Sequence, residues 1–99
     1  MWILQNSDAV DAASALTFRL VPGAIKTIGR ATGADFIVDA ALVSRLHCQL
    51  TAGADTLEVE DLSSTNGTYV NDQRVARAAL ANGDRLRVGR VELKIERQV

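Results

Sequence analysis

Three short polar stretches of this 99-residue chain combine hydroxyl, amide and guanidinium side chains with glycine. They are the GR pair at residues 29–30, the SRLH stretch at 44–47 and the STNGT stretch at 64–68. Loops of this composition present hydroxyls, an amide and backbone N–H groups, which are suited to holding an anion and an extended peptide. The three stretches therefore indicate a site for an anionic, peptide-like ligand.

Arg30 and Ser44 are the two side chains best suited to an anion. The planar guanidinium of Arg30 can make a two-pronged, charge-assisted contact with phosphate, and the Ser44 hydroxyl can donate to a phosphate oxygen. Taken alone, a loop arginine is usually a solvated surface residue, and a loop serine often bonds its own backbone. Their interpretation as ligand residues therefore depends on the stretches that accompany them.

His47 and Cys48 are adjacent, which raises the question of a nucleophile with its base. On a strand such neighbours point to opposite faces, so the two side chains would diverge. No acid is placed to orient the imidazole. We therefore interpret His47 as a structural residue that holds neighbouring loops, and Cys48 as a small core residue.

Two Asn-Gly pairs carry the strongest two-residue signal for a type I′ hairpin turn. Asn82-Gly83 fits that turn well, because apolar strand residues lie on both sides. Asn66-Gly67 fits it less well, because the preceding residues 63–65 are polar and do not continue a strand pattern. The first pair is predicted as a hairpin and the second as part of a binding loop.

The elements that must position these loops are predicted to be strands. Short alternating or apolar runs recur along the chain, with turn signals between them and no amphipathic helical pattern. Residues 9–15 are rich in alanine and are predicted as a loop. The pattern indicates an all-β antiparallel sandwich. The predicted strands are Trp2–Leu4, Leu16–Leu20, Ile25–Ile28, Phe36–Val38, Cys48–Thr51, Leu57–Glu60, Thr68–Val70, Gln73–Val75, Arg85–Val88 and Val91–Ile95.

Composition narrows the class of protein. The chain is one domain long, and its 47% of hydrophobic residues allow a core. A net charge of −1 argues against nucleic acid as a partner. A single cysteine excludes an internal disulfide, and the absence of a signal-peptide pattern or a long apolar run predicts a cytoplasmic protein with no membrane insertion.

The three polar stretches, in this order and spacing, resemble the signature of the forkhead-associated (FHA) domain family, whose members bind phosphothreonine peptides. The resemblance covers nearly the whole chain. It implies two twisted sheets of the FHA/SMAD-like kind, with the binding loops at one end. It also implies a single FHA domain over residues 1–99, with its core at about 2–97, as a module of a larger protein, bacterial in sequence style.

The resemblance also assigns roles to residues. Arg30 and Ser44 match phosphate contacts, and Arg45 matches a position that touches peptide or phosphate. Thr65 matches a residue that helps to enclose the phosphothreonine, and Asn66 one that bonds the peptide main chain. The residues expected to support these loops are Gly29, which serves the turn, His47, Gly67 and Thr68.

These observations predict a phosphopeptide-binding module for phosphorylation-dependent signalling. Its expected partner is a phosphothreonine segment of another protein or of its own full-length chain, with no metal and no cofactor. We expect no enzymatic activity, because paired carboxylates and clustered metal ligands are absent from the sequence pattern. The alternative is an FHA-like structural module that binds its partner without phosphate.

Overall fold

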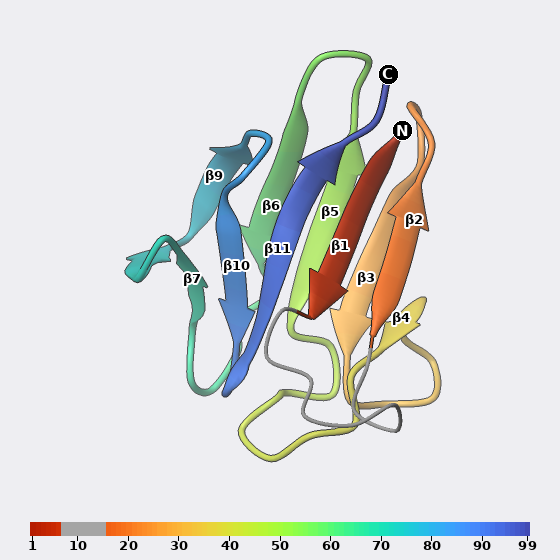
Figure 1. Cartoon of the computed structure of the whole chain (residues 1–99). Helices are drawn as coiled ribbons and strands as arrows, with labels where there is room; N and C mark the ends of the chain where they lie inside the picture. The colour runs from red at the N-terminus through yellow and green to blue at the C-terminus, as the bar shows by residue number, and fades with distance from the viewer. Residues whose placement is uncertain (7–15) are drawn as a thin grey trace.

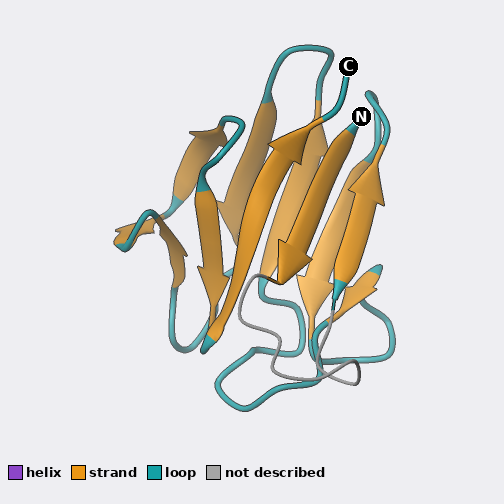
Figure 2. Cartoon of the chain, viewed as in Figure 1, coloured by secondary structure: helices purple, strands orange, loops and turns teal. Residues whose placement is uncertain are grey.

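A computed structural model describes residues 1–6 and 16–99, and every regular element within them is a strand (Figures 1 and 2). The predicted loop at 9–15 lies outside the described residues. No helix long and apolar enough to span a membrane occurs in the described part of the chain. The strands are β1 (Trp2–Asn6), β2 (Thr17–Leu20), β3 (Ile25–Gly29), β4 (Phe36–Ile37), β5 (Cys48–Ala52), β6 (Leu57–Asp61), β7 (Thr68–Val70), β8 (Gln73–Val75), β9 (Arg77–Leu80), β10 (Arg85–Val88) and β11 (Val91–Arg97).

The strands form two facing sheets, which confirms the predicted β-sandwich. One sheet has the order β2-β1-β11-β10-β7-β8, and the other has the order β4-β3-β5-β6-β9. All pairs are antiparallel except β3 and β4, which run parallel. Alternation of apolar residues gives the inward face of a strand but not its direction relative to a neighbour, so this parallel pair was not predicted.

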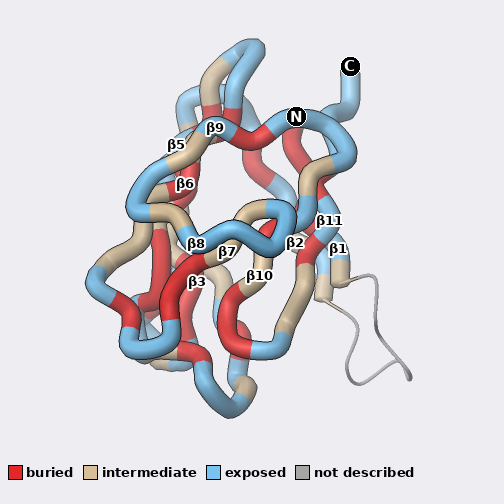
Figure 3. The backbone as a smooth tube through the Cα atoms, turned by 90° about the vertical axis from the view of Figure 1, so that its left-hand side faces the viewer, coloured by how far each residue is buried: buried red, intermediate tan, exposed pale blue. Residues whose placement is uncertain are grey.

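The core lies between the two sheets, where the apolar residue of each alternating pair points inward (Figure 3). On β10, for example, Leu86 and Val88 are fully buried while Arg85 is exposed. On the neighbouring β11, Leu93 and Ile95 are fully buried in the same way. Each such side chain stabilises the fold by roughly 1.5–3 kcal/mol when it is removed from water.

Strand β9 was missed from the sequence. Its residues, Arg77–Leu80, include neither aromatic nor β-branched side chains, so propensity gives no signal. Its place is set by pairing with β6 and by Arg77, whose guanidinium contacts Glu58 at 3.0 Å and Glu60 at 2.8 Å. Long-range pairing and cross-strand charge pairs therefore override the weak local preference.

The predicted hairpin at Asn82-Gly83 is wrong. The strands on either side, β9 and β10, belong to different sheets, and of this pair only Gly83 has a positive φ, at 92°. The pair that has positive φ at both positions is Asn71-Asp72, at 49° and 69°, and it joins β7 to β8. An asparagine or aspartate at each central position can therefore form the type I′ turn without glycine.

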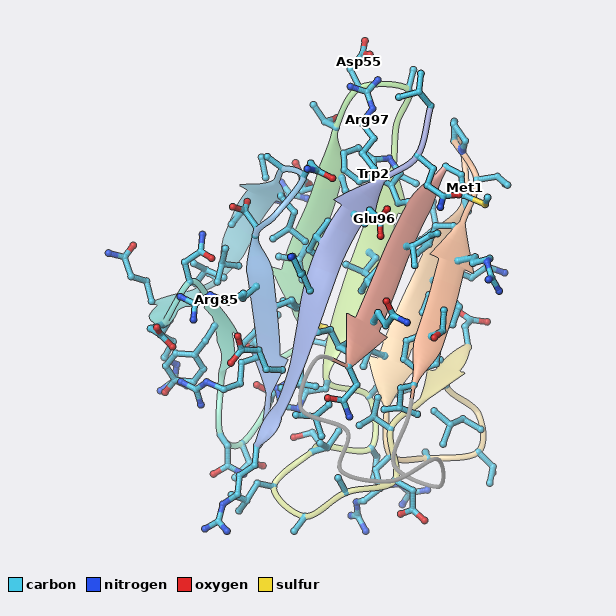
Figure 4. All side chains as sticks on the ribbon, viewed as in Figure 1. Met1, Trp2, Asp55, Arg85, Glu96 and Arg97 are labelled. Atoms are coloured by element: carbon cyan, nitrogen blue, oxygen red, sulfur yellow. The ribbon has the colours of Figure 1, made fainter. Side chains whose placement is uncertain are left out.

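The two chain ends lie together at one end of the sandwich, away from the loops at the other end (Figure 1). The indole of Trp2 donates to the Gly53 carbonyl at 3.2 Å, and Arg97 lies 5.7 Å from the indole ring centre. Arg97 also contacts Asp55 at 2.7 Å (Figure 4). These contacts close the end of the core that carries none of the three polar stretches.

Gly29, the last residue of β3, allows the backbone to approach the 44–47 stretch. A Cβ at this position would overlap the carbonyl oxygen of Arg45 and come within 3.0 Å of the Leu46 Cα. Its φ is not among the positive ones, so glycine is required here by the close approach and not by a left-handed backbone conformation. The absent side chain lets Arg30 and Ala31 donate to the carbonyls of the neighbouring stretch.

We predict that Gly29→Ala lowers the free energy of unfolding by roughly 1–3 kcal/mol, because the added methyl forces two backbone segments apart. Gly33→Ala is the matched control, since nothing lies within 4 Å of a Cβ there. Urea unfolding of both variants tests this. Equal stability of the two variants would contradict the proposed close approach.

Candidate functional site

The three polar stretches meet at the end of the sandwich opposite the chain termini. Arg30 follows β3, Ser44 and Arg45 lie between β4 and β5, and Thr65 and Asn66 lie between β6 and β7. All five line one open hollow of about 600 Å³, whose other lining residues are Asp39 to Val43. The structure thus brings together every residue that the sequence predicted to touch the ligand.

The backbone and Nε of Arg30 are held by hydrogen bonds, while its terminal nitrogens face the hollow without a carboxylate partner among the described residues. Its backbone N–H donates to the Ser44 carbonyl at 2.9 Å, and its Nε donates to the Val43 carbonyl at 3.2 Å. Within the described residues, no carboxylate lies within 4.0 Å of the guanidinium of Arg30 or of Arg45. Two exposed cations without a neutralising partner at one hollow favour an anionic ligand.

Ser44 connects the first two stretches to the third. Its Oγ accepts the backbone N–H of Thr65 at 3.0 Å, and its own N–H donates to Nδ1 of His47 at 3.0 Å. Since the oxygen accepts in this contact, the hydroxyl hydrogen remains available to donate. Ser44 can therefore offer a hydrogen bond into the hollow while holding the Thr65 loop in place.

The His47 ring is fully buried and uses both nitrogens. Because Nδ1 accepts from Ser44, Nε2 carries the proton and donates to the Gly67 carbonyl at 2.8 Å. The ring thus connects the loop before β5 to the loop before β7. It has no free nitrogen with which to act as a base.

Cys48 follows His47 as the first residue of β5, and His47 itself lies just outside that strand. The His47 backbone still bonds to both flanking segments, to the Ile28 carbonyl at 2.8 Å and from the Leu62 N–H at 2.9 Å, and both side chains are fully buried. Burial raises the pKa of the Cys48 thiol to about 12. A thiol that is buried and protonated is not a nucleophile, so the pair offers no catalytic centre.

A hydrogen-bonded cluster around Asp61 shapes the third loop. The Asp61 carboxylate accepts from the Ser64 hydroxyl at 2.5 Å, from the Ser64 N–H at 3.2 Å and from the Thr68 hydroxyl at 2.7 Å. The Ser64 hydroxyl oxygen in turn accepts the Gly67 N–H at 3.0 Å. Thr68 was expected to support this loop, but no role was predicted for Asp61 or Ser64. Their spacing of three residues, which is typical of aspartate-initiated turns, was the available signal.

The ionised form of Asp61 is favoured in this cluster. Partial burial disfavours the charge, but the hydrogen bonds from Ser64 and Thr68 outweigh burial and hold the pKa of Asp61 below its ordinary value. The charged carboxylate therefore contributes to the stability of the loop.

Asn66 and Gly67 complete the third loop. The Asn66 side-chain N–H donates to the Leu42 carbonyl at 3.1 Å, which leaves the amide oxygen free to accept a hydrogen bond from a ligand. Gly67 has a φ of 89°, and a Cβ there would lie 2.7 Å from Nε of Arg74. Asn66-Gly67 is thus no type I′ turn, as the polar residues before it indicated.

The described residues contain no group of histidine, cysteine and carboxylate side chains that could hold a metal ion. The chemistry of the hollow is that of two guanidinium groups, hydroxyls, an amide and backbone groups. Such a set binds an anion and the main chain of a peptide.

Comparison with known proteins gives one consistent family. The model of the FHA domain matches residues 26–89. The glycogen accumulation regulator GarA of Mycobacterium tuberculosis is 39% identical over 74 residues, which are 75% of this chain and 46% of GarA. This chain spans less than half the length of the curated relatives that it matches first.

Two solved structures are similar over almost the whole chain. One, from a study of phosphothreonine-dependent FHA domain interactions, is 34% identical with a TM-score of 0.87, and the match covers 99% of this chain and 97% of that one. The other is the crystal structure of the FhaA FHA domain complexed with the intracellular domain of Rv3910. It is 34% identical with a TM-score of 0.85, and the match covers 97% of this chain and 100% of that one.

We predict that Asp61→Asn lowers stability at pH 6 by on the order of 1.5 kcal/mol, because hydrogen bonds to a charged acceptor are weakened. The carboxylate has a lowered pKa in the folded state, so its contribution is present above the unfolded pKa of about 3.9 and is lost as pH falls through the folded value.

Urea unfolding of the wild-type protein and of Asp61→Asn at pH 6 and near pH 2.5 tests this prediction. The stability of the variant should fall less over this range than that of the wild type. Asp55→Asn, at the opposite end of the fold, is the control. An acid-induced loss of stability that is the same with and without Asp61 would rule out the cluster as its source.

Proposed function

The chain belongs to the forkhead-associated (FHA) family, and on that basis we propose that its loop end binds phosphothreonine in an extended segment of a partner protein. The observation that carries this proposal is the hollow itself, where Arg30, Ser44 and Arg45 converge and where no carboxylate of the described residues lies within 4.0 Å of either guanidinium group. A phosphorylated threonine carries −1.5 to −2 charges at neutral pH and three strong acceptor oxygens. Its charge and its acceptors match these donors.

In the proposed complex, the terminal nitrogens of Arg30 and the hydroxyl of Ser44 donate to phosphate oxygens, and Arg45 contacts phosphate or peptide. Arginine clusters are a recurring means of recognising phosphorylated segments. The support is that the base of Arg30 and the oxygen of Ser44 are already held by hydrogen bonds. Fixed donors lose little conformational freedom when the anion binds.

Thr65 and Asn66 are proposed to hold the rest of the ligand. The free amide oxygen of Asn66 can accept a main-chain N–H of the peptide, since its N–H is held by the Leu42 carbonyl. Thr65 is exposed at the same hollow, where it helps to enclose the threonine methyl. Gly29, His47, Gly67 and Thr68 are proposed to support the loops through the contacts described above.

The relatives favour a regulatory role without catalysis. GarA carries the name of a regulator, and the FhaA FHA domain was crystallised with the intracellular domain of another protein. We infer that the present chain acts likewise in kinase-linked signalling in the cytoplasm, as a single FHA module within a larger protein. Its phosphothreonine lies either in a partner or in another segment of its own full-length chain.

We predict that the protein binds a phosphothreonine peptide, binds the matched phosphoserine peptide about tenfold or more weakly, and does not measurably bind the unphosphorylated one. One methyl group in a fitted pocket is worth roughly 1–3 kcal/mol. Because the preferred sequence is unknown, a library of phosphothreonine peptides supplies the ligand, and calorimetric titration supplies the affinities. Equal affinity for phosphorylated and unphosphorylated forms would favour the structural module that needs no phosphate.

We further predict that Arg30→Ala and Asn66→Ala both weaken binding of the same phosphothreonine peptide, and that they change the salt dependence of its affinity differently. Loss of the charged contact should cost roughly 1.5–3 kcal/mol and reduce the dependence of affinity on salt. Loss of the neutral amide should cost about 0.5–1.5 kcal/mol and leave the salt dependence in place.

Titrations of both variants at low and high salt distinguish the two contacts. Both side chains are exposed, so the melting temperatures should match that of the wild type. Unchanged affinity of Arg30→Ala would show that the phosphate binds elsewhere.

A further inference from the structure

Arg30 and Arg45 line two hollows. The hollow described above is lined on its far side by the segment from Asp39 to Val43. A second hollow of about 290 Å³ is lined by the same two arginines together with Ala31 and Thr32. A phosphate held by the arginines would therefore adjoin both hollows.

The charges around the two hollows differ. Of these two hollows Asp39 lines the first, and it also borders a third hollow of about 380 Å³ on the side of Val38 and Val91. The residues of the second hollow, Ala31 and Thr32 besides the arginines, include no acid. Within residues 1–6 and 16–99, Asp39 has no cation within 4.0 Å, although it shares its hollow with two arginines. The first hollow thus has one negative side chain beside the two arginines, and the second hollow has none.

The backbone holds Asp39 in this place. The Val38 N–H donates to the Gly29 carbonyl at 2.8 Å, which attaches this segment to the end of β3. The Ala40 N–H donates to the Val38 carbonyl at 3.0 Å, which closes a tight turn centred on Asp39. The exposed carboxylate is therefore held on a fixed backbone turn at the rim of the hollow.

We propose that the loop end selects the order of charges around the phosphothreonine: a basic side chain on the Asp39 side and an acidic side chain on the Thr32 side. This inference rests on the proposed function. An unpaired Asp39 repels the phosphate, and a lysine or arginine of the peptide removes that repulsion by pairing with it. An acidic group on the other side can pair with Arg30 and Arg45, which both line the second hollow.

Two phosphothreonine peptides of identical composition test the proposal. One carries lysine before and glutamate after the phosphothreonine, and the other carries the reverse order. A third peptide with alanine at both positions is the reference. Each favourable pair of exposed charges is worth roughly two- to fivefold in affinity, so one order should bind at least about twofold more tightly than the other. This difference should shrink at high salt.

Two variants locate the source of the preference. Asp39→Asn should bind the alanine-flanked peptide at least as tightly as the wild type, because the repulsion between Asp39 and the phosphate is gone. It should no longer gain affinity when a lysine replaces the alanine at the first hollow. Thr32→Glu should lower the affinity for the peptide whose glutamate lies at the second hollow, because the two carboxylates repel each other. Glu96→Gln on β11 (Figure 4) is the matched control for the loss of a negative charge. Thr56→Glu, between β5 and β6, is the matched control for the gain of one, and neither residue lines either of the two hollows.

The outcomes separate this inference from the proposed function. If no phosphothreonine peptide binds, the proposed function is wrong and this inference is wrong with it. If all three peptides bind equally, the phosphothreonine site stands and the charge selection is wrong. An order preference that persists in both Asp39→Asn and Thr32→Glu also overturns the proposal, because the two hollows are then not its source.

Discussion

The candidate site depends on one buried imidazole. The His47 ring accepts the Ser44 N–H and donates to the Gly67 carbonyl, so a single side chain connects two loops that are 20 residues apart in the sequence. The bond to the Gly67 carbonyl is buried and the bond from Ser44 is partly buried, and an unpaired polar group is costly in such surroundings. Because neither loop contains a regular element, their relative position depends on such side-chain contacts and on the few backbone bonds between them.

Gly29 and Asp61 attach the loops held by His47 to the strands of the sandwich. The missing side chain of Gly29 lets β3 lie directly against the 44–47 stretch, and the Asp61 cluster sets the path from β6 to β7. The residues proposed to contact the ligand are exposed, apart from the partly buried Ser44, while the residues that position them are buried or partly buried. This division allows Arg30 and Asn66 to vary with the ligand at little cost in stability, whereas the supporting residues cannot vary so freely.

The sequence predicted the sandwich because alternation is a local signal, whereas the gathering of the loops at one end was expected from the resemblance to the FHA family. Alternation marks the inward faces of β10 and β11, and hydroxyl, amide and guanidinium residues mark the loops. It did not predict β9, the parallel β3–β4 pair or the role of Gly29, because these depend on partners distant in the chain. The Asn82-Gly83 turn failed for the same reason, since a turn motif does not say whether the strands around it belong to one sheet.

Asp39 shows why the net charge of a chain does not reveal the local charges of a binding site. The net charge of −1 suggests a nearly neutral surface, yet at the loop end two arginines and one aspartate remain without mutual ion pairs. Elsewhere on the described surface, Arg77, Arg85 and Arg97 each have an acidic partner. Other charged residues of the described surface, such as Arg19 and Arg90, also have no ion pair within 4.0 Å, so the loop end differs in bringing two such arginines and an aspartate to one hollow. A site of this kind gains affinity from the phosphate and selectivity from the charges beside it, because the first is common to every phosphorylated segment and the second is not.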